Sequence, residues 1–181
     1  MPTLSIIETE RLKLIPFISA RHLNDRYVDW LNDPDVVRYS EQRHKSHTLE
    51  SCAAFVASFK DSPGHLWAIE QASDGKHIGN IHADIDLNNG IADVAILIGA
   101  REIWGQGYGL EAWNSVLAWL KFQGSVRKIV AGCMRSNTAM HNIMIKSGMT
   151  EDGQRQNHYL LDGKPEDIVF YALHVPPQSQ P

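Results

Sequence analysis

Three glycines at alternate positions, Gly105, Gly107 and Gly109, lie where an apolar, strand-like run gives way to a long amphipathic helical pattern. Because glycine has no side chain, backbone N–H groups in such a turn can point at one bound anion, and the helix N-terminus adds roughly half a positive charge. The segment lacks the Lys-Ser/Thr of a P-loop, and no acidic residue ends a strand about 20 residues later, as dinucleotide-binding folds require. It therefore predicts a diphosphate-binding loop of another kind, with a tight, closely packed turn as the alternative interpretation.

Residues that could move a proton precede this loop. His82 and Asp84 are two positions apart on one expected strand, so their side chains face the same side of the sheet. A histidine beside a carboxylate can accept a proton near neutral pH, whereas a solvated strand end would carry the same residues without function. Glu102 is a further candidate base, or an acid that favours the helix dipole. Asp93, on the next expected strand, is another acid considered for this role, and the alternative is that its side chain only forms a hydrogen bond with a neighbouring backbone group.

Composition narrows the class of protein. The chain has 181 residues, so we expect one domain over residues 1–175 and a disordered tail over 176–181. Its formal net charge of −4 does not favour nucleic acid or an anionic membrane as a partner. No apolar run approaches the ~20 residues that cross a bilayer, and the first ten residues lack the basic region of a secretory signal. We therefore expect a cytoplasmic protein.

Metal and cysteine chemistry are not expected. His44 and His47 have no cysteine or acidic partner at a metal-binding spacing, so the sequence predicts no metal site. Cys52 and Cys133 are the two cysteines, and both fall in expected helix or strand surroundings that favour reduced, buried thiols. An acyl-carrying nucleophile at Cys133 is the alternative to a small packing residue there.

The periodicity of apolar residues and the turn residues between them predict the elements that position these groups. We expect helices over residues 19–31, from Thr48 onwards, over 107–123, and from Asn137 to Ser147-Gly148. We expect strands over 12–15, 66–71, 77–86, 91–99, 129–132, 159–161 and 168–173, with turns at Asp74-Gly75, Asn89-Gly90 and Asp162-Gly163. The order indicates an α+β domain in which about four helices flank a mixed, mostly antiparallel sheet of six to seven strands.

Residues 92–112 resemble the acetyl-CoA loop of the GNAT superfamily of N-acetyltransferases: a strand, Ile-Gly, an acidic residue, Trp-Gly-x-Gly-Tyr-Gly and Glu-Ala. Trp104 at the start of the loop is typical of the branch that resembles ribosomal-protein N-terminal acetyltransferases, and we expect it to pack under the loop. Residues 137–149 are similar to the family's Asn-x-x-Ser, helix, Lys-x-Gly-Phe segment. The last part of the chain is similar to the pattern near the C-terminal end of the family's domain, through Gly153, Arg155, Tyr159, Asp162-Gly163, Asp167 and Tyr171. The resemblance is strongest over residues 78–171.

The resemblance implies acetyl-CoA as co-substrate and assigns residues to it. Strand residues would offer backbone groups to the pantetheine arm and thioester: Ile96, Leu97 and Ile98. Loop residues would surround the pyrophosphate: Gly105, Gln106, Gly107, Tyr108 and Gly109. Helix residues would contact the pantetheine and the adenosine-phosphate end: Asn137, Asn142 and Lys146. The structural alternative is an ordinary N-cap at Asn137 and a lysine that complements the helix dipole.

One position departs from the family. The serine proposed to protonate the departing CoA thiolate aligns with Met140, which has no proton to donate. His141 can donate one, since imidazole titrates near neutral pH, but it points about 100° away around the helix. A tyrosine elsewhere or a water molecule are the other candidates for this acid.

The resemblance implies direct transfer of an acetyl group to a primary amine in a ternary complex. The resemblance to the branch of ribosomal-protein N-terminal acetyltransferases implies a protein N-terminus or a polyamine as the acceptor. The basic and aromatic loop at 38–47 lies where related folds admit the acceptor, and there Tyr39, Arg43 and His44 would bind a polar or phosphorylated amine such as a nucleotide-linked amino sugar. Met140 favours the alternative of a non-catalytic CoA-binding or regulatory module. A homodimer is a further expectation, because relatives commonly dimerise.

Overall fold

The computed structural model describes residues 6–176, which contain five α-helices, two 3₁₀-helices and eight strands. The helices are α1 (Ser19–His22), α2 (Asp25–Asn32), η1 (Glu41–His44), α3 (Leu49–Ala57), η2 (Arg101–Ile103), α4 (Tyr108–Lys121) and α5 (Thr138–Lys146). The strands are β1 (Ile7–Glu8), β2 (Leu12–Pro16), β3 (His65–Gln71), β4 (His77–Asp86), β5 (Ile91–Ile98), β6 (Lys128–Met134), β7 (Thr150–Leu161) and β8 (Lys164–His174).

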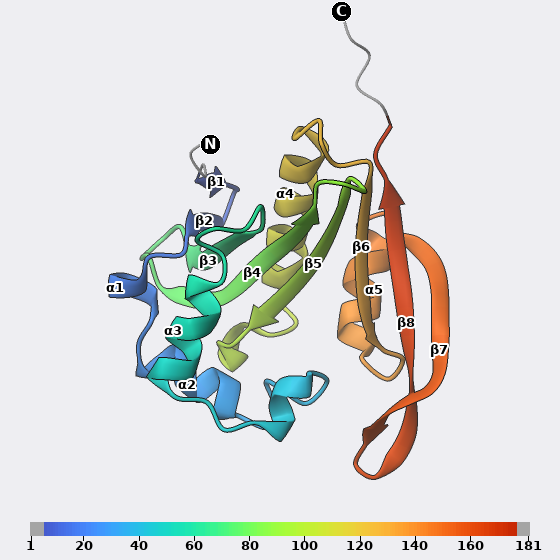
Figure 1. The fold of residues 1–181 in the computed structure, drawn as a ribbon. Coiled ribbons are helices and arrows are strands. Elements are labelled where there is room, and N and C mark those ends of the chain that lie inside the picture. Colours follow the sequence, from blue (N-terminus) through green and yellow to red (C-terminus); the bar gives the residue numbers. More distant parts are fainter. Residues whose placement is uncertain (1–5, 177–181) are drawn as a thin grey trace, which may run out of the picture.

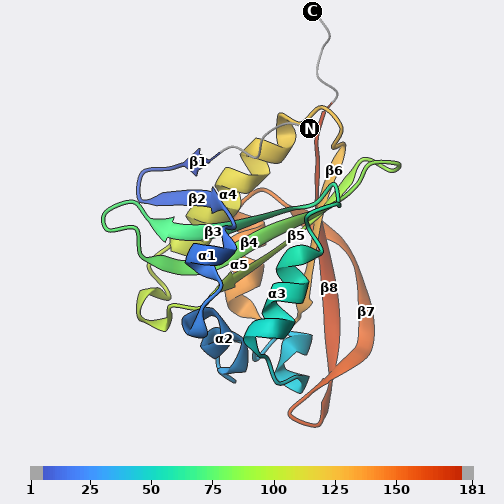
Figure 2. The same cartoon turned by 60° about the vertical axis from the view of Figure 1, so that its left-hand side comes forward.

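All eight strands form one sheet in the order β1-β2-β3-β4-β5-β6-β8-β7. Every neighbouring pair among these described strands is antiparallel except β5 and β6, which run parallel. Helices α4 and α5 lie on one face of the sheet, and α2 and α3 lie on the other (Figures 1 and 2). The predicted α+β class is confirmed, with one short edge strand and one helix more than expected.

The core forms where α4 meets the sheet. Helix α4 buries Trp113, Val116, Leu117 and Leu120, which recur at helical spacing along one face. On β5, Ala92 and Val94 point into this core, so the alternation of a strand turns the residues between them to the opposite face. The predicted three-stranded meander is confirmed, and its two turns place Gly75 and Gly90 at φ 71° and 62°.

The single helix expected over residues 19–31 is wrong. The chain forms two short helices instead, because Leu23 adopts an extended conformation and the Asn24 side chain caps α2 by accepting from the N–H of Tyr27. Ser19 is not the N-cap of α1, since Ile18 occupies that position without a side-chain bond. The helix predicted to begin at Thr48 is confirmed by a capping box between Thr48 and Ser51.

The closing hairpin is much longer than predicted. Strands β7 and β8 begin at Thr150 and Lys164, although the sequence indicated strands only over 159–161 and 168–173. Strand β7 is an edge strand that is exposed almost throughout, so it lacks apolar alternation, and two register shifts interrupt its pairing. Within the described residues no helix is long and apolar enough to span a membrane. Apart from Pro176, the predicted tail over 176–181 lies outside the described residues.

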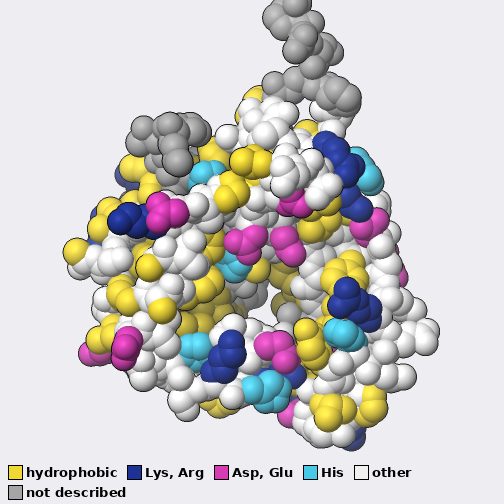
Figure 3. Space-filling view, viewed as in Figure 1, with side chains coloured by type: hydrophobic (Ala, Val, Ile, Leu, Met, Phe, Trp, Pro, Cys, Tyr) yellow, Lys and Arg dark blue, Asp and Glu magenta, His cyan; other side chains and the backbone are white. Residues whose placement is uncertain are grey.

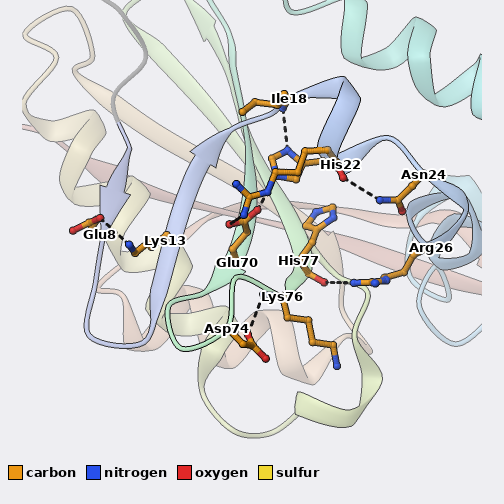
Figure 4. Close-up of polar contacts among 11 residues, drawn as sticks. Glu8, Lys13, Ile18, His22, Asn24, Arg26, Glu70, Asp74, Lys76 and His77 are labelled. Atoms are coloured by element: carbon orange, nitrogen blue, oxygen red, sulfur yellow. Dashed lines mark hydrogen bonds and ion pairs between the residues drawn. The ribbon is translucent and has the colours of Figure 1, made fainter.

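A buried polar cluster attaches α1 to the sheet (Figure 4). His22 is fully buried; its Nδ1 accepts from the N–H of Ile18 at 2.9 Å, so its Nε2–H donates to Glu70 Oε1 at 2.9 Å. Arg21 Nη2 donates to the other oxygen of Glu70 at 2.6 Å. Burial lowers the pKa of His22, although the neighbouring carboxylate of Glu70 opposes this shift. The lowered pKa keeps the imidazole neutral near pH 7.

This cluster predicts unequal effects of two substitutions at Glu70. Glu70→Leu leaves the buried Nε2–H of His22 without an acceptor, so the free energy of unfolding should fall by about 1–3 kcal/mol. Glu70→Gln retains an oxygen for that hydrogen bond and should cost less. Urea denaturation of both variants measures the difference, and equal losses would show that the hydrogen bond of His22 does not anchor α1.

Candidate functional site

Strands β5 and β6 are the one parallel pair in the described sheet, and they separate after a few residues. Ile91–Asp93 pair with Lys128–Val130; beyond this, β5 stays with β4 as far as Ile98, and β6 stays with β8 as far as Met134. The two halves of the sheet then diverge (Figure 1). A cavity of about 290 Å³ opens between them, and Figure 3 shows the molecule hollowed near its centre.

The diverging part of β5 presents backbone groups to this gap. A Cβ on Gly79 would collide with the carbonyl oxygen of Leu97, so that oxygen faces β4. Backbone direction alternates along a strand, which turns the carbonyls of Ile96 and Ile98 away from β4. Trp104 Nε1 donates to the Ile98 carbonyl at 2.9 Å, although the side chain is 44% exposed. Trp104 therefore supports the loop through a hydrogen bond and is not buried beneath it.

The glycine loop follows directly. Gly105 and Gly107 have φ values of 76° and 84°, and Gly107 is the N-cap of α4. Nothing lies within 4 Å of a Cβ built on Gly105, so one side of the loop is open. The N–H groups of Tyr108, Gly109 and Leu110 belong to the first turn of α4 and have no acceptor within the helix. An open loop of this kind fits a diphosphate without a lysine.

An internal brace holds this loop in place. The carboxylate of Glu111 accepts from Thr9 Oγ1 at 2.6 Å and from the backbone N and Nε of Arg11 at 2.9 and 2.7 Å. Arg11 also donates to the carbonyl of Gln106 and lies 4.2 Å from the ring centroid of Tyr108. Sequence reasoning missed Thr9 and Arg11, since they contact Glu111 across about one hundred positions. The signal that could have indicated this contact was Glu111 itself, an acid in the first turn of a helix, beside a predicted anion site, where it would need a cationic partner.

Three titratable side chains lie on the α3 face of the sheet beside the gap. Asp84 is the direct register partner of Asp93, and His82 Nε2 lies 3.6 Å from Asp84 Oδ2. The His82 ring packs against Phe55 of α3 and against Phe59, which follows that helix, and burial lowers the pKa of His82. Of these three, Asp93 lines the cavity. The Asp93 carboxylate is open to the cavity on one side and packed against protein on the others. This partial burial, together with the charge of Asp84, raises the pKa of Asp93 to about 6.

A family model described as an acetyltransferase (GNAT) domain matches residues 11–150. The chain belongs to the GNAT acetyltransferases. It is therefore an acyltransferase whose acetyl donor is acetyl-CoA, and the strand gap and open glycine loop fit such a donor. No curated protein matches the sequence.

Solved structures share the fold of this GNAT acetyltransferase. RimL, a ribosomal L7/L12 α-N-protein acetyltransferase in complex with coenzyme A, has a TM-score of 0.82 at 16% identity, covering 94% of this chain and 98% of that one. The spermidine N-acetyltransferase from Vibrio cholerae, with CoA and spermine, has a TM-score of 0.80 at 16% identity, covering 92% and 97%. The microcin C7 self-immunity acetyltransferase MccE, with acetyl-CoA and AMP, has a TM-score of 0.75 at 17% identity, covering 92% and 94%.

Helix α5 carries the second set of residues predicted for the co-substrate. The Asn137 side chain accepts from the N–H of Met140 at 3.1 Å and so caps the helix. Asn142 and Lys146 are exposed. Ile143, between them, lies 3.3 Å from a Cβ built on Gly109, which places α5 beside the glycine loop. The structure thus gives Asn137 a structural contact and leaves the other two side chains accessible.

Met140 packs against the core, and the next residue makes the polar contact. His141 Nδ1 lies 3.1 Å from the hydroxyl of Tyr171 on β8, and its Nε2 is buried without a hydrogen-bond partner among the described residues. Burial raises the pKa of Tyr171, and the thiol of Cys133 is among the groups that raise it. Cys133 lines the cavity, and burial raises its own pKa to about 12, so the thiol keeps its proton and is a poor nucleophile.

Glu102 lies apart from the residues that line the gap. It forms an ion pair with Lys76 at 2.6 Å and faces a second cavity of about 430 Å³, together with Arg26 and Arg101. The hydrogen bond from Lys76 lowers the pKa of Glu102. Of the four predicted catalytic residues, the structure thus brings His82 and Asp84 next to a cavity residue, places His141 on α5, and puts Glu102 elsewhere.

The loop around η1 forms the opposite wall of the cavity. Tyr39 and Glu41 line it, and Arg43 is held by Glu41, the carbonyl of Ser40 and the carbonyl of Leu160. Arg43 therefore ties this loop to the β7–β8 hairpin, while His44 is exposed and does not line the cavity. The hairpin adds Arg155, His158 and Tyr159, none of which we singled out as acceptor residues. Within residues 6–176, no three His, Cys, Asp or Glu side chains are grouped to hold a metal ion.

Proposed function

We propose that this protein transfers the acetyl group of acetyl-CoA to a primary amine that enters the cavity between β5 and β6. The observation that carries the proposal is the course of β5. It parts from β6 after Asp93, which lines the cavity there, and it leads at its other end into the open glycine loop. The loop residues from Gly105 to Gly109 bind the pyrophosphate, and the backbone groups of Ile96 and Ile98 that point away from β4 lie along the pantetheine arm. Leu97, which was predicted with them, turns its carbonyl to β4 and is not available for this role. Asn137, Asn142 and Lys146 flank the co-substrate from α5.

Asp93 is the general base of this proposal. An amine attacks a thioester only after losing a proton, and a carboxylate with a pKa near 6 is ionised at pH 7 yet still basic enough to accept it. Asp84, directly opposite Asp93, adjusts that basicity, and His82 packs behind Asp84. The backbone donors of the diverging strands polarise the thioester carbonyl, and orientation in the ternary complex supplies much of the rate.

The departing thiolate also needs a proton, which Met140 cannot supply. Tyr171 has a hydroxyl within hydrogen-bond distance of His141, and it holds its proton at neutral pH because burial raises its pKa. His141, 3.1 Å from that hydroxyl, orients it and can return a proton after transfer. This assignment gives Tyr171 the place of the family's serine and gives His141 a positioning role.

The pH profile of kcat/KM provides a test of Asp93 and Asp84. Activity should rise with pH through an acidic limb near 6, because protonated Asp93 cannot act as a base. The negative charge of Asp84 raises this pKa, so Asp84→Asn should move the limb to lower pH. Initial rates between pH 5 and 8 measure the position of this acidic limb in the parent protein and in the variant. A limb that stays in place in Asp84→Asn would show that another group accepts the proton.

A non-catalytic CoA-binding module is the second candidate, favoured by Met140 in the serine position. Calorimetry with CoA combined with a thiol-release assay over a panel of amines separates the two functions. CoA binding with amine-dependent thiol release supports the enzyme. CoA binding without release for any amine supports the module, and an absence of CoA binding removes both.

A further inference from the structure

One cation in the cavity wall has no counter-ion. Arg155 of β7 lines the same cavity as Asp93, and its guanidinium makes no hydrogen bond or ion pair with any residue in the part of the chain that the structure describes. Its neighbours differ in this respect. Arg38 pairs with Asp162 at 2.7 Å, Arg43 pairs with Glu41 at 2.7 Å, and Arg135 contacts Gln154 and Asp167.

The position of Arg155 suits it to bind an anion. Its guanidinium carbon lies 5.3 Å from the ring centroid of Phe170, another residue of the cavity wall. Stacking on an aromatic ring restricts the orientation of the guanidinium and leaves its edge donors free. Those donors form a planar fork that matches a carboxylate or a phosphate with two parallel hydrogen bonds.

Charged side chains of both signs surround the opening. In Figure 3, acidic side chains lie above the hollow, a basic group lies to its right towards the β7–β8 hairpin, and both signs occur along its lower rim. Asp93 and Arg155 both line one cavity of about 290 Å³. A molecule that fills this volume can therefore contact the carboxylate of Asp93 and the unpaired guanidinium of Arg155, because the third charged residue of the wall, Glu41, is already paired with Arg43. A polycation would place positive charge against Arg155.

We propose that the acceptor is a small primary amine that carries an anionic group, a carboxylate or a phosphate, which Arg155 binds while the amine faces Asp93. This inference rests on the proposed function and specifies its substrate class. Tyr39, His158 and Tyr159 also line this cavity and add aromatic surface that can contact the acceptor. Arg155 is thus a specificity-determining residue.

Matched pairs of amines test the proposal. Glycine and glycinamide differ in a carboxylate, glucosamine 6-phosphate and glucosamine differ in a phosphate, and spermidine represents a polycation. For the pair that reacts, kcat/KM should be at least ten-fold higher for the anionic member. Arg155→Gln should abolish this preference by raising KM for the anionic amine ten- to hundred-fold, a loss much larger than any change in kcat/KM for the neutral amine. Lys164→Gln removes one positive charge from the same hairpin without touching the cavity and should change neither value.

Failure of this inference is distinguishable from failure of the reaction. Equal kcat/KM within both pairs, a preference for spermidine, or an anionic preference that survives Arg155→Gln overturns the inference and leaves acetyl transfer intact. If no amine is acetylated, calorimetry of the same amines with the CoA-loaded protein decides. Binding of the anionic members that Arg155→Gln weakens ten-fold or more supports the site without the reaction, and no binding of any member overturns the inference.

Discussion

Replacing Asp93 with asparagine should lower kcat for acetyl transfer by about 100- to 10,000-fold, the range that a positioned general base contributes. Asparagine has nearly the same shape but cannot accept a proton from the attacking amine. The Kd for CoA should stay unchanged, because Asp93 lies at the cavity and not at the glycine loop. Steady-state thiol release and calorimetry on the same preparation measure the two quantities.

The pH dependence of this variant distinguishes lost basicity from lost packing. In Asp93→Asn the acidic limb near pH 6 should disappear, and kcat/KM should keep rising until the free amine loses its own proton. Asp152→Asn is the matched control, since Asp152 is a strand acid that pairs with Lys128 away from the cavity. A kcat within three-fold of the parent in Asp93→Asn would exclude Asp93 as the base.

Replacing Gly107 with valine should weaken CoA binding by about 100-fold or more. Gly107 has φ 84°, a conformation that costs a β-branched residue on the order of 1–3 kcal/mol, equal to roughly a five- to 150-fold change in an equilibrium constant. The valine side chain would also stand where the first turn of α4 meets a diphosphate. Calorimetric titration with CoA measures the loss, and kcat at saturating acetyl-CoA should change much less.

Gly124 provides the control for backbone strain. It has φ 61° in the segment between α4 and β6, and nothing lies within 4 Å of a Cβ built there. Gly124→Val should therefore lower the melting temperature without changing the Kd for CoA. If both valine variants bind CoA as the parent protein does, the glycine loop is not the pyrophosphate site.

The elements that the sequence predicted well are those with a strong local pattern. Helix α4 has apolar residues at helical spacing, the β3–β5 meander has turn dipeptides between its strands, and α3 begins with a capping pair. These signals act within a few residues, so they can be read without the fold. Strand β7 carries no such signal, because an exposed edge strand is held by its partner β8 and not by apolar alternation.

The predicted helix over 19–31 failed for a related reason. Its apolar spacing was correct, but His22 turns into the interior to meet Glu70, and Asn24 offers its side chain as a new cap. A contact between residues 48 positions apart outweighed the local periodicity. Glu102 is a second example of a distant contact that the sequence did not show. It pairs with Lys76 and faces the second cavity, away from the cavity that Asp93 lines.

The sequence by itself determined the kind of chemistry. The alternate glycines before α4, with the strand and acid around them, predict an anion-binding loop, because the positive-φ backbone of such a turn depends only on consecutive residues. Only the tertiary structure decided which side chains share the cavity. Asp93 and Arg155 come together because β5 and β6 part after three paired positions. Arg155 stays unpaired among the described residues, whereas Arg38, Arg43 and Arg135 pair with Asp162, Glu41 and Asp167. Such pairings depend on the packing of distant strands, which no local pattern encodes.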